Sequence, residues 1–477
     1  MTDDRPDPSP SSLPRTASQA AATGVLSGHI AARIDRLPLT RVQYLLAAIT
    51  QVYWGMLIDT DGIVGRLYPF VWEPQGMSTF QFSVLLASNI GAGILTGQYI
   101  GGYLSDRFGR KRVLVASALI DAVFLWPIAH TSDFWWLLLW NYLYGVGLGL
   151  MLATNNVYLH EIAPPGMRHR LAMRTQLITA VCAIIPGILG VIFVPQDWQW
   201  FIYVLVIIQL VVVTPLGVFL LPESPRWLEQ KGRVEEADRI VARWEADIER
   251  RHGPLPDPDT SRNPVVQTQK VPLRELFAGT YGRRIALIMI VWSLAYAGIV
   301  YGASSYLPTY LVDHHWSAQE VFVWVSIVAA LTRIGGFYAA SFTGERVERK
   351  NLLLTIGIAW AVLFSMLLVF PSKPAQIVIV LIALPLGTLW LFNMYNYTTQ
   401  SFPTRLRSAG YSWSNGVGHT AAVWGPMLIA PLFASTADQG HWGWILWVAV
   451  GGAVLPSLLI GRFGIRQRNQ TLEETAT

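Results

Sequence analysis

The chain of 477 residues contains a single cysteine, Cys182, and only 14% of its residues carry a charge. One cysteine can form neither an internal disulfide framework nor a cysteine-rich metal site. Soluble domains usually carry about 25% charged residues, so this chain has too few charges to cover a water-facing surface. The shortage argues against a soluble enzyme, a disordered protein and a nucleic-acid-binding protein.

Motifs of enzyme chemistry are missing as well. The sequence has no H-E-x-x-H zinc motif, no nucleophile elbow and no glycine-rich phosphate loop. We therefore expect no enzymatic activity, no metal, no cofactor and no nucleic-acid partner. Primary transport driven by ATP binding to this chain is excluded on the same ground.

Most of the chain consists of long apolar stretches with few charged residues. Residues 42–221 and 285–461 hold only 28 charged residues in 357 positions, and a helix that crosses a bilayer needs roughly 20 mostly apolar residues. Twelve stretches meet this need, which predicts an all-α membrane protein with two six-helix bundles. The expected spans are 42–65, 80–104, 113–130, 134–160, 171–194, 200–221, 285–311, 321–343, 352–370, 375–398, 409–433 and 442–461.

The segments outside the spans carry most of the charge. We expect a partly disordered N-terminal tail that ends in a short interfacial helix, a hydrophilic linker with short helices, and a short C-terminal tail. In residue numbers the division is a tail over 1–40, a bundle over 41–221, the linker over 222–284, a bundle over 285–462 and a tail over 463–477.

Arg and Lys in the short connections predict the orientation. Eleven lie on one side and only Arg66 and Lys373 on the other. We therefore expect both termini and the linker to be cytoplasmic, in a multi-pass protein of the plasma membrane. The eleven are Arg107, Arg110, Lys111, Arg112, Arg168, Arg170, Arg346, Arg349, Lys350, Arg405 and Arg407.

The two halves repeat at one offset. The segment from Asp106 to Lys111 has its counterpart 239 residues later, from Glu345 to Lys350. Glu161, Pro164 and Arg168 correspond at the same offset to Gln400, Pro403 and Arg407. The halves are therefore interpreted as parallel repeats, related by an axis along the membrane normal. Paired acids and arginines at helix ends can clamp neighbouring spans at the cytoplasmic mouth.

These residues resemble the major facilitator superfamily over about residues 41 to 462. Gly102, Asp106, Arg107, Gly109, Arg110 and Lys111 match its loop motif G-x-x-x-D-R-x-G-R-[RK], and Pro222 to Leu228 matches the P-E-S-P-R-x-L signature of the sugar-porter and organic-ion branch. The resemblance implies a twelve-helix alternating-access transporter. The expected cytoplasmic gate consists of Asp106, Arg107, Arg110, Glu161, Arg168, Glu223, Arg226, Glu345, Arg346, Arg349 and Arg407.

Departures from the sugar-porter pattern are informative. Ala295 and Tyr296 take the positions of the paired glutamines in the seventh span, and Tyr301 takes that of the asparagine. Gln176 alone resembles a sugar-binding amide. A hexose site is therefore disfavoured, and the segments Ile34 to Pro38 and Ser305 to Leu311 look more like metabolite:proton symporters of the aromatic-acid and niacin type.

Ionisable residues inside spans are functional candidates because a charge in hydrocarbon costs a few kcal/mol. Resemblance to the branch favours Asp59 as the proton-coupling group, with Asp61 second. Arg333 lies about 18 Å from the cytoplasmic end of its helix, near the depth of substrate sites, where a guanidinium can pair with a carboxylate or an Asp of another helix. Asp121 is expected to pair between helices, and Arg174 to extend to the interface.

Polar side chains at i, i+3 and i+4 mark helix faces toward a central cavity. Such stripes occur on the seventh, tenth and eleventh spans, although single members can equally join helices. Together with Arg333 and Gln176, the predicted substrate-binding residues are Tyr301, Ser305, Asn393, Asn396, Asn415 and His419; Ser304 and Tyr397 share two of the stripes.

The sequence thus predicts a secondary transporter that couples proton symport to a small organic acid, an aromatic or heterocyclic carboxylate, and acts as a monomer in the lipid bilayer. A sugar:proton symporter and a drug or organic-cation efflux pump are alternatives within the class. A membrane transceptor is the alternative from another class, which the short C-terminal tail disfavours.

Overall fold

A computed structural model describes residues 29–61, 63–164, 168–258, 273–343, 347–402, 407–421, 423–425 and 441–467. For some residues in these ranges only the backbone is described. These are 58–61, 168–170, 172–173, 273, 301–304, 339–343, 407–409, 412, 441–442 and 444–445.

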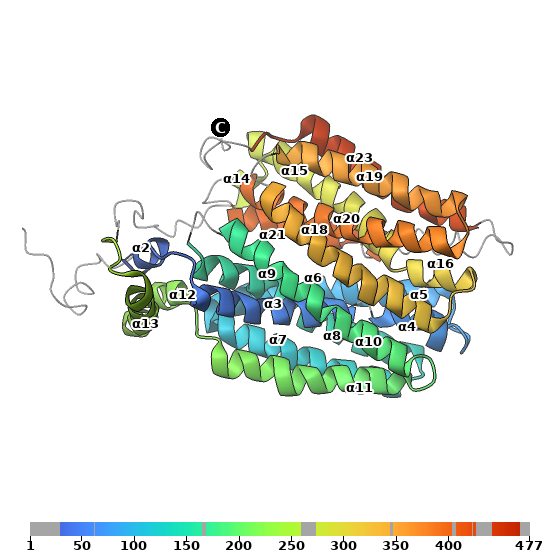
Figure 1. Cartoon of the computed structure of the whole chain (residues 1–477), viewed down its shortest axis with the longest axis horizontal. Coiled ribbons are helices and arrows are strands. Elements are labelled where there is room, and N and C mark those ends of the chain that lie inside the picture. Colours follow the sequence, from blue (N-terminus) through green and yellow to red (C-terminus); the bar gives the residue numbers. More distant parts are fainter. Residues whose placement is uncertain are drawn as a thin grey trace, which may run out of the picture.

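All regular secondary structure in the described residues is helical, and the helices of the bundle run roughly along one long axis (Figure 1). The N-terminal half contains α3 (Arg41–Asp61), α4 (Ile63–Val71), α5 (Thr79–Leu86), η1 (Ala87–Gly93), α6 (Ile94–Phe108), α7 (Arg110–Leu125), η2 (Trp126–His130), α8 (Phe134–Ile162), α9 (Arg168–Cys182), α10 (Ile184–Phe193), α11 (Trp198–Ile208), η4 (Gln209–Val213) and η5 (Leu216–Leu220). The C-terminal half contains α15 (Gly279–Ala295), η7 (Tyr296–Ser304), α16 (Leu307–Asp313), α17 (Ala318–Val321), η8 (Phe322–Val328), α18 (Ala329–Thr343), α19 (Arg349–Val369), α20 (Lys373–Gln400), α21 (Arg407–His419) and α23 (His441–Phe463).

Ten of the twelve expected spans appear among the described residues as helices long and apolar enough to cross a membrane. The other two, expected at 42–65 and 409–433, both include residues outside the described part. The helices extend beyond the predicted bounds in places: α4 continues to Val71, and α15 begins at Gly279, inside the predicted linker. Polar and charged residues are tolerated at helix ends, so hydropathy alone places those ends too early or too late.

The offset of 239 residues between the two halves also relates the first residues of equivalent helices. Helices α5 and α17 begin at Thr79 and Ala318, α7 and α19 at Arg110 and Arg349, and α8 and α20 at Phe134 and Lys373. The first pair also shares its cap, because Ser78 with Gln81 and Ser317 with Glu320 each form a reciprocal capping box. The local signals that start these helices are therefore repeated along with the fold.

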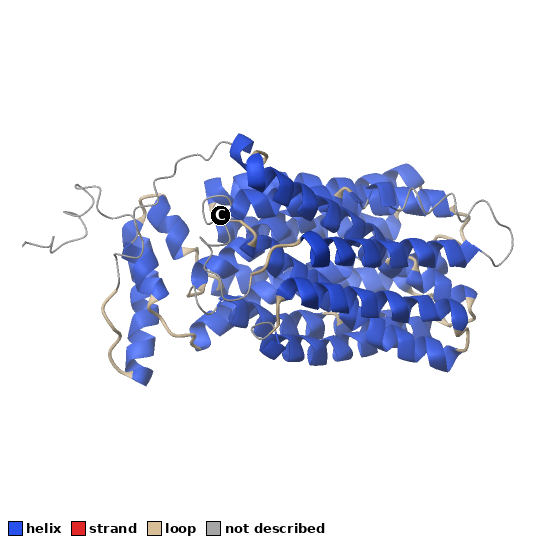
Figure 2. Ribbon diagram, turned by 90° about the horizontal axis from the view of Figure 1, so that it is seen from above, coloured by secondary structure: helices blue, strands red, loops and turns tan. Residues whose placement is uncertain are grey.

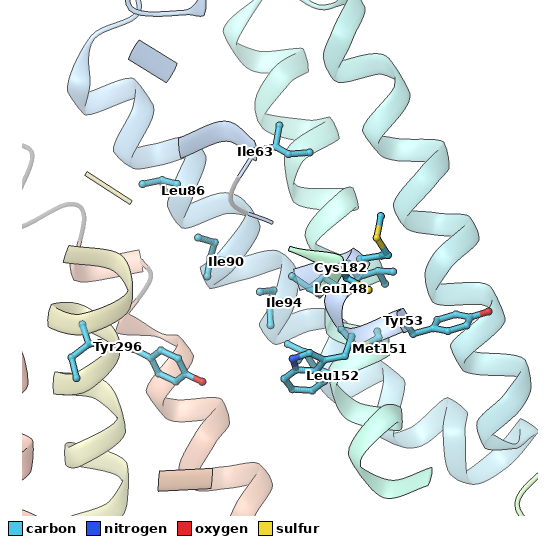
Figure 3. Packing of buried hydrophobic residues seen from close by; sticks show 14 of the residues in the cluster. Tyr53, Ile63, Leu86, Ile90, Ile94, Leu148, Met151, Leu152, Cys182 and Tyr296 are labelled. Carbon is cyan, nitrogen blue, oxygen red and sulfur yellow. The ribbon is translucent and has the colours of Figure 1, made fainter. Parts of the chain in front are cut away.

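Small residues bring helices close together in the N-terminal half. An added Cβ at Gly97 would lie 2.8 Å from the Gly149 Cα, so α6 and α8 approach with backbone almost against backbone. Helices α3 and α9 meet in the same way, because a Cβ at Gly55 would lie 2.7 Å from the Cβ of Cys182. Figure 3 shows Cys182 beside Leu148, Met151 and Tyr53 in the core of this half.

The two halves meet along α9–α10 and η8–α18, which pack against each other over their length. At the end far from the linker, Ser83 Oγ lies 2.7 Å from the Tyr306 hydroxyl, and Gln319 Nε2 donates to the Val194 carbonyl at 3.4 Å. The halves are therefore joined at that end in this conformation.

The opposite end carries a helical cap of α2 (His29–Asp35), α12 (Pro225–Gln230) and α13 (Val234–His252), seen apart from the bundle in Figures 1 and 2. Helix α13 is longer than the short helices expected of the linker, in which α14 (Leu273–Leu276) also lies. Its apolar face, with Val241 and Ile248 fully buried, packs on α2 and α12. Arg33 of α2 donates to Glu245 of α13 at 2.5 and 3.1 Å.

Candidate substrate site and cytoplasmic clamp

A hydrogen-bonded cluster of four side chains lies in the C-terminal half. Tyr296 stands where α15 widens into the π-helical segment η7, a distortion that is frequent at functional sites. Its hydroxyl lies 2.8 Å from the Tyr395 hydroxyl and 3.2 Å from Nε2 of His419, and it accepts a hydrogen bond from Asn415 Nδ2 at 3.0 Å. Three helices, α15–η7, α20 and α21, thus supply one polar centre.

The position of the cluster along α21 matches a central site. Asn415 and His419 lie eight and twelve residues after the start of α21, about 12 and 18 Å along its axis. Asn415, His419 and Tyr296 are buried, whereas Tyr395 is partly exposed. The polar atoms of the cluster therefore lie inside the C-terminal half, and Tyr395 is its least buried residue.

Aromatic rings surround this polar centre. The Trp292 ring stacks on Tyr296 with centroids 5.1 Å apart and lies 4.8 Å from the Tyr395 ring. Its indole nitrogen donates to Thr398 Oγ1 at 2.9 Å, which fixes the ring. Aromatic rings beside a few polar groups are typical of small-molecule sites. Trp292 itself is fully buried and holds the two tyrosine rings in place.

Sequence reasoning named Asn415 and His419 but not Tyr296, Tyr395 or Trp292 as ligand-binding residues. Of these three residues, only Tyr296 was named, as a departure from the sugar-porter pattern. The signal was nevertheless present, because the i, i+4 spacing of Asn415 and His419 marks the face of α21 that meets Tyr296.

Other predicted substrate residues of the C-terminal half lie apart from this hydrogen-bonded cluster. Asn393 and Asn396 donate to carbonyls of their own helix, those of Leu389 and Phe392. Ser305 lies at the boundary between the halves, since its carbonyl oxygen is 3.5 Å from where a Cβ at Gly65 would stand. The side chain of Tyr301 lies outside the described residues.

Arg333 is half-buried on α18, a helix that packs against α9 and α20. The guanidinium therefore lies on an element that touches both halves of the molecule. This location suits a group that senses a ligand between the halves.

The N-terminal half contributes buried amides with unused hydrogen-bonding capacity. Among the described residues, neither Oε1 of Gln176 nor the side-chain nitrogen and oxygen of Asn155 has a hydrogen-bond partner. An unsatisfied buried polar atom costs about 1–3 kcal/mol, so such atoms mark positions where water or a ligand supplies the missing bond. Asn155 is a candidate that the sequence did not single out.

The remaining intramembrane acids and bases differ in their surroundings. The side chains of Asp59 and Asp61 lie outside the described residues. Asp121 is fully buried and accepts a hydrogen bond from Gln209 Nε2 at 2.9 Å, which joins α7 to η4. Arg174 is exposed and donates to the Tyr44 hydroxyl at 3.0 Å.

Several residues of the predicted cytoplasmic gate, which lie at the linker end, form pairs within each half. These pairs are called the clamp below. Arg110, whose side chain is 5% exposed, holds Glu161 with an Nη2–Oε1 distance of 2.9 Å. At the equivalent positions of the second half, Arg349 donates to Oε1 of Gln400. Each pair joins the start of one span to the end of the next, so the clamp connects α7 to α8 and α19 to α20.

Glu223 caps the start of α7 with its carboxylate. Its Oε1 accepts hydrogen bonds from the backbone nitrogens of Arg110, Lys111 and Ser224 at 2.8, 3.2 and 2.9 Å, and a negative charge at a helix N-terminus is stabilising. Gly109 has a φ of 103°, and a Cβ there would lie 2.1 Å from Glu223 Oε2. Glycine is thus required by both backbone conformation and space.

Arg226 connects the clamp to the cap. It donates through Nε to the Glu161 carbonyl at 3.0 Å and forms an ion pair with Asp35. Arg107 is exposed and contacts only local groups among the described residues, with its Nη1 2.9 Å from the Tyr103 hydroxyl. Asp106 reaches Arg110 at 3.1 Å but is 78% exposed. The side chains of Arg168, Glu345, Arg346 and Arg407 lie outside the described part.

Two surface clefts, of about 470 and 390 Å³, lie beside the cap rather than between the halves. They are lined by the segment between α2 and α3 and by the end of α13, including His252. Neither contains a residue of the predicted substrate site.

The fold has solved counterparts. The inward-open xylose transporter XylE from E. coli superposes with a TM-score of 0.67 at 18% identity, covering 91% of this chain and 98% of that one. The predicted all-α major facilitator fold is confirmed. Membership of a transporter family, shown by the match over residues 61–477, makes the molecule a multi-pass membrane transporter and not an enzyme.

The family model described as Sugar (and other) transporter matches residues 61–477, and the chain belongs to this family of the major facilitator superfamily. Its relatives include a niacin transporter, NiaP, from Acinetobacter baylyi, 25% identical over 93% of this chain and 99% of the relative. A 4-hydroxybenzoate transporter, PcaK, from the same organism is 25% identical over 88% of this chain and 91% of its own length.

Proposed function

We propose that this transporter is a proton-coupled symporter of a small aromatic or heterocyclic carboxylate, which it carries across the plasma membrane by alternating access. The observation that carries the proposal is the cluster of Tyr296, Tyr395, Asn415 and His419 beside the Trp292 ring. It combines hydrogen-bonding groups with flat apolar faces, which together suit a planar ring that bears a polar group. The names of the niacin and 4-hydroxybenzoate transporters agree with this ligand class.

Arg333 supplies the charge that a carboxylate requires. A guanidinium can form two parallel hydrogen bonds with a carboxylate, and such charge-assisted bonds are about twice as strong as neutral ones. Its helix α18 touches α9 of the other half. A bound anion would therefore draw the two halves together on this side of the molecule.

Asp59 is the proposed proton carrier, with Asp61 as second candidate, because both are acidic residues inside the first span, within α3. A carboxyl group binds a proton more readily when it is removed from water. Closure around an acid in this span would favour proton uptake, and opening to the other side would favour release. We propose further that both termini and the cap face the cytoplasm, since arginine and lysine predominate at that end.

The substrate class is tested by a thermal-shift screen of the purified protein with 4-hydroxybenzoate, niacin, their amides, xylose and an organic cation, because a ligand that binds only the folded state raises its apparent stability. We expect stabilisation by the acids alone. Arg333→Gln should weaken acid binding by about ten- to hundredfold, as expected for a hydrogen bond to a charged group. Arg174→Gln is the matched control, because Arg174 is exposed and bonds to Tyr44.

Equal stabilisation by an acid and its amide would show that the site does not recognise the negative charge of the carboxylate. A response to xylose instead would favour a sugar substrate, for which the unsatisfied amides of Gln176 and Asn155 are the supporting observation.

Proton coupling is tested separately in proteoliposomes. An inward proton gradient should drive accumulation of the acid that the screen identifies, and Asp59→Asn should abolish this accumulation while leaving exchange of labelled for unlabelled substrate. Asp61→Asn provides the comparison for the second candidate. Undiminished gradient-driven accumulation by Asp59→Asn would rule out Asp59 as the coupling group.

A further inference from the structure

The smaller of the two clefts beside the cap has a basic lining. It lies between the start of α3 and the end of α13, and the residues that line it are Leu39, Thr40, Arg41, Tyr44, Asp247, Arg251 and His252. Arg41, Arg251 and His252 are exposed. Asp247 is the only acid among the described residues of this lining. The cleft thus collects positive groups from two helices that are far apart in the sequence.

Asp247 offsets only part of this positive charge. Its Oδ1 lies 3.1 Å from Nη2 of Arg251 and 3.7 Å from Nη2 of the exposed Arg250. A further cation stands beside the lining, because the exposed Arg174 of α9 donates to the Tyr44 hydroxyl at 3.0 Å. Arginines from α3, α9 and α13 therefore outnumber the single carboxylate, and the cleft attracts an anion.

The cleft lies at the level where the bundle enters the membrane. Arg41 is the first residue of α3, the helix of the first expected span. Figure 1 shows the cap at the end of the bundle where α3 begins. Arg174 lies six residues after the start of α9, about 9 Å along that helix, and a long arginine side chain at this depth extends toward the interface. These basic groups are therefore expected at the height of lipid phosphates.

An apolar surface continues from the cleft along the same two helices. Leu45 follows Arg41 by one turn on the same face of α3 and is 57% exposed. On α9, Val181 follows Arg174 by two turns and is 52% exposed. Helices α3 and α9 pack against each other. Basic groups at the helix ends and apolar side chains beyond them match the headgroup and the acyl chains of a phospholipid, whereas a soluble phosphate would use only the basic part.

We infer that this cleft binds the phosphate-bearing headgroup of an anionic phospholipid, and that the bound lipid ties α13 of the cap to the start of the first span. A guanidinium group can give two parallel charge-assisted hydrogen bonds to a phosphate. The Tyr44 hydroxyl, which accepts from Arg174, can donate its own hydrogen to the same group. The inference concerns a lipid and is independent of the transported substrate.

The charge of the lipid is tested with the wild-type protein. Native mass spectrometry of the purified full-length chain compares phosphatidylglycerol with phosphatidylcholine of the same acyl chains. We expect the first phosphatidylglycerol to bind about tenfold more tightly, because each arginine near an anionic headgroup contributes several-fold. This preference should shrink as ionic strength rises. Equal binding of the two lipids would overturn the inference.

Variants test whether the lipid occupies this cleft. Arg41→Gln and Arg251→Gln should each weaken phosphatidylglycerol binding by about fivefold, with phosphatidylcholine binding unchanged. Arg251→Gln should have the larger effect, since it also releases Asp247. Arg239→Gln is the matched control for charge, because Arg239 is exposed on α13, donates to the Glu235 carbonyl and lies twelve residues before Arg251. An equal effect in Arg239→Gln would show diffuse attraction and no site in the cleft.

Hydrogen exchange in lipid nanodiscs tests the tie to the cap and the source of the phosphate. Residues 247–252 should be protected several-fold more in discs that contain phosphatidylglycerol than in discs of phosphatidylcholine alone. Arg41→Gln should remove this difference, although Arg41 belongs to α3, and residues 235–240 should not respond. An absence of lipid-dependent protection would refute the tie. Equal protection by millimolar inorganic phosphate in phosphatidylcholine discs would identify a site for soluble phosphate and overturn the assignment to a lipid.

Discussion

At the residue scale, the two halves use different side chains to bind the equivalent arginines of the clamp. Arg110 is paired with an ionised partner, Glu161, whereas Arg349 at the equivalent position is paired with the neutral amide of Gln400. Both arginines join the start of one span to the end of the next. A guanidinium binds a carboxylate more strongly than it binds a neutral amide, so the second half is expected to hold its clamp less firmly.

Exchanging the two partners tests this difference. Glu161→Gln should destabilise the protein by about 1–3 kcal/mol, because it removes the buried counter-charge of Arg110 and leaves only the exposed Asp106, although it retains a hydrogen bond. Gln400→Glu should raise stability, because it places a carboxylate in the position of the neutral amide that Arg349 contacts. Thermal unfolding in detergent measures both, and a loss of stability in Gln400→Glu would contradict the expectation.

Single residues of the site were only partly predictable. The clamp arginines and Glu161 could be named because motifs fix their spacing in the sequence. Tyr296 and Tyr395 lie 99 positions apart, and their hydroxyls meet only because α15, α20 and α21 pack together. No local pattern encodes that meeting, whereas the spacing of Asn415 and His419 could indicate a polar face.

At the scale of elements, helix α2 shows which features can be predicted from the sequence and which cannot. The stretch before the first span predicted a short helix at the membrane interface, and α2 lies over His29–Asp35. Its partner α13 begins about 200 residues later, and only the folded cap brings Arg33 to Glu245. The existence of the spans was predictable from the length of the apolar stretches, whereas the π-helical segments depend on packing.

The packing of α2 on α13 should weaken as the pH falls. Burial by itself would raise the pKa of Glu245, but hydrogen bonds from Arg33 and Arg36 outweigh it, and the pKa is lowered. A lowered folded pKa gives a stabilisation that is present above the usual glutamate range and is lost as pH falls below about 4.5. The protection factors of the amides of residues 29–36, which correct for the slower intrinsic exchange in acid, should therefore fall several-fold on acidification through this range.

Two substitutions in α13 check the cause. Glu245→Gln should loosen α2 already at neutral pH, by about 1–3 kcal/mol, since it removes the charge from hydrogen bonds with two arginines. Glu249→Gln is the matched control, because Glu249 is exposed on the same helix. Equal exchange rates in the two variants would show that Glu245 does not hold α2.

At the scale of the whole molecule, two similar halves share one boundary. Spans 5 and 8 pack along their length, and the Ser83–Tyr306 hydrogen bond joins the halves at the end away from the cap. Alternating access requires that such contacts be individually weak, because each must break in every cycle. One hydrogen bond of about 1 kcal/mol meets this requirement.

Removing that bond should favour opening at the same end. Tyr306→Phe keeps the ring against Phe82 but loses the hydroxyl, so we expect about fivefold faster maleimide labelling of a cysteine placed at Gly65, beside Ser305. Tyr310→Phe is the control, because that hydroxyl donates to Leu367 within one half. Equal labelling rates in both variants would refute a role for the Ser83–Tyr306 bond in closure.

The lone thiol of the chain has a practical consequence for following these movements. Cys182 is 6% exposed and packs against Gly55 where two helices almost touch. Spin labels or fluorophores can therefore be attached at chosen positions on each half without first rebuilding the protein as a cysteine-less version. Distances between such probes, measured by pulsed electron resonance with and without candidate ligands, would give the amplitude of the rocking motion in the native sequence.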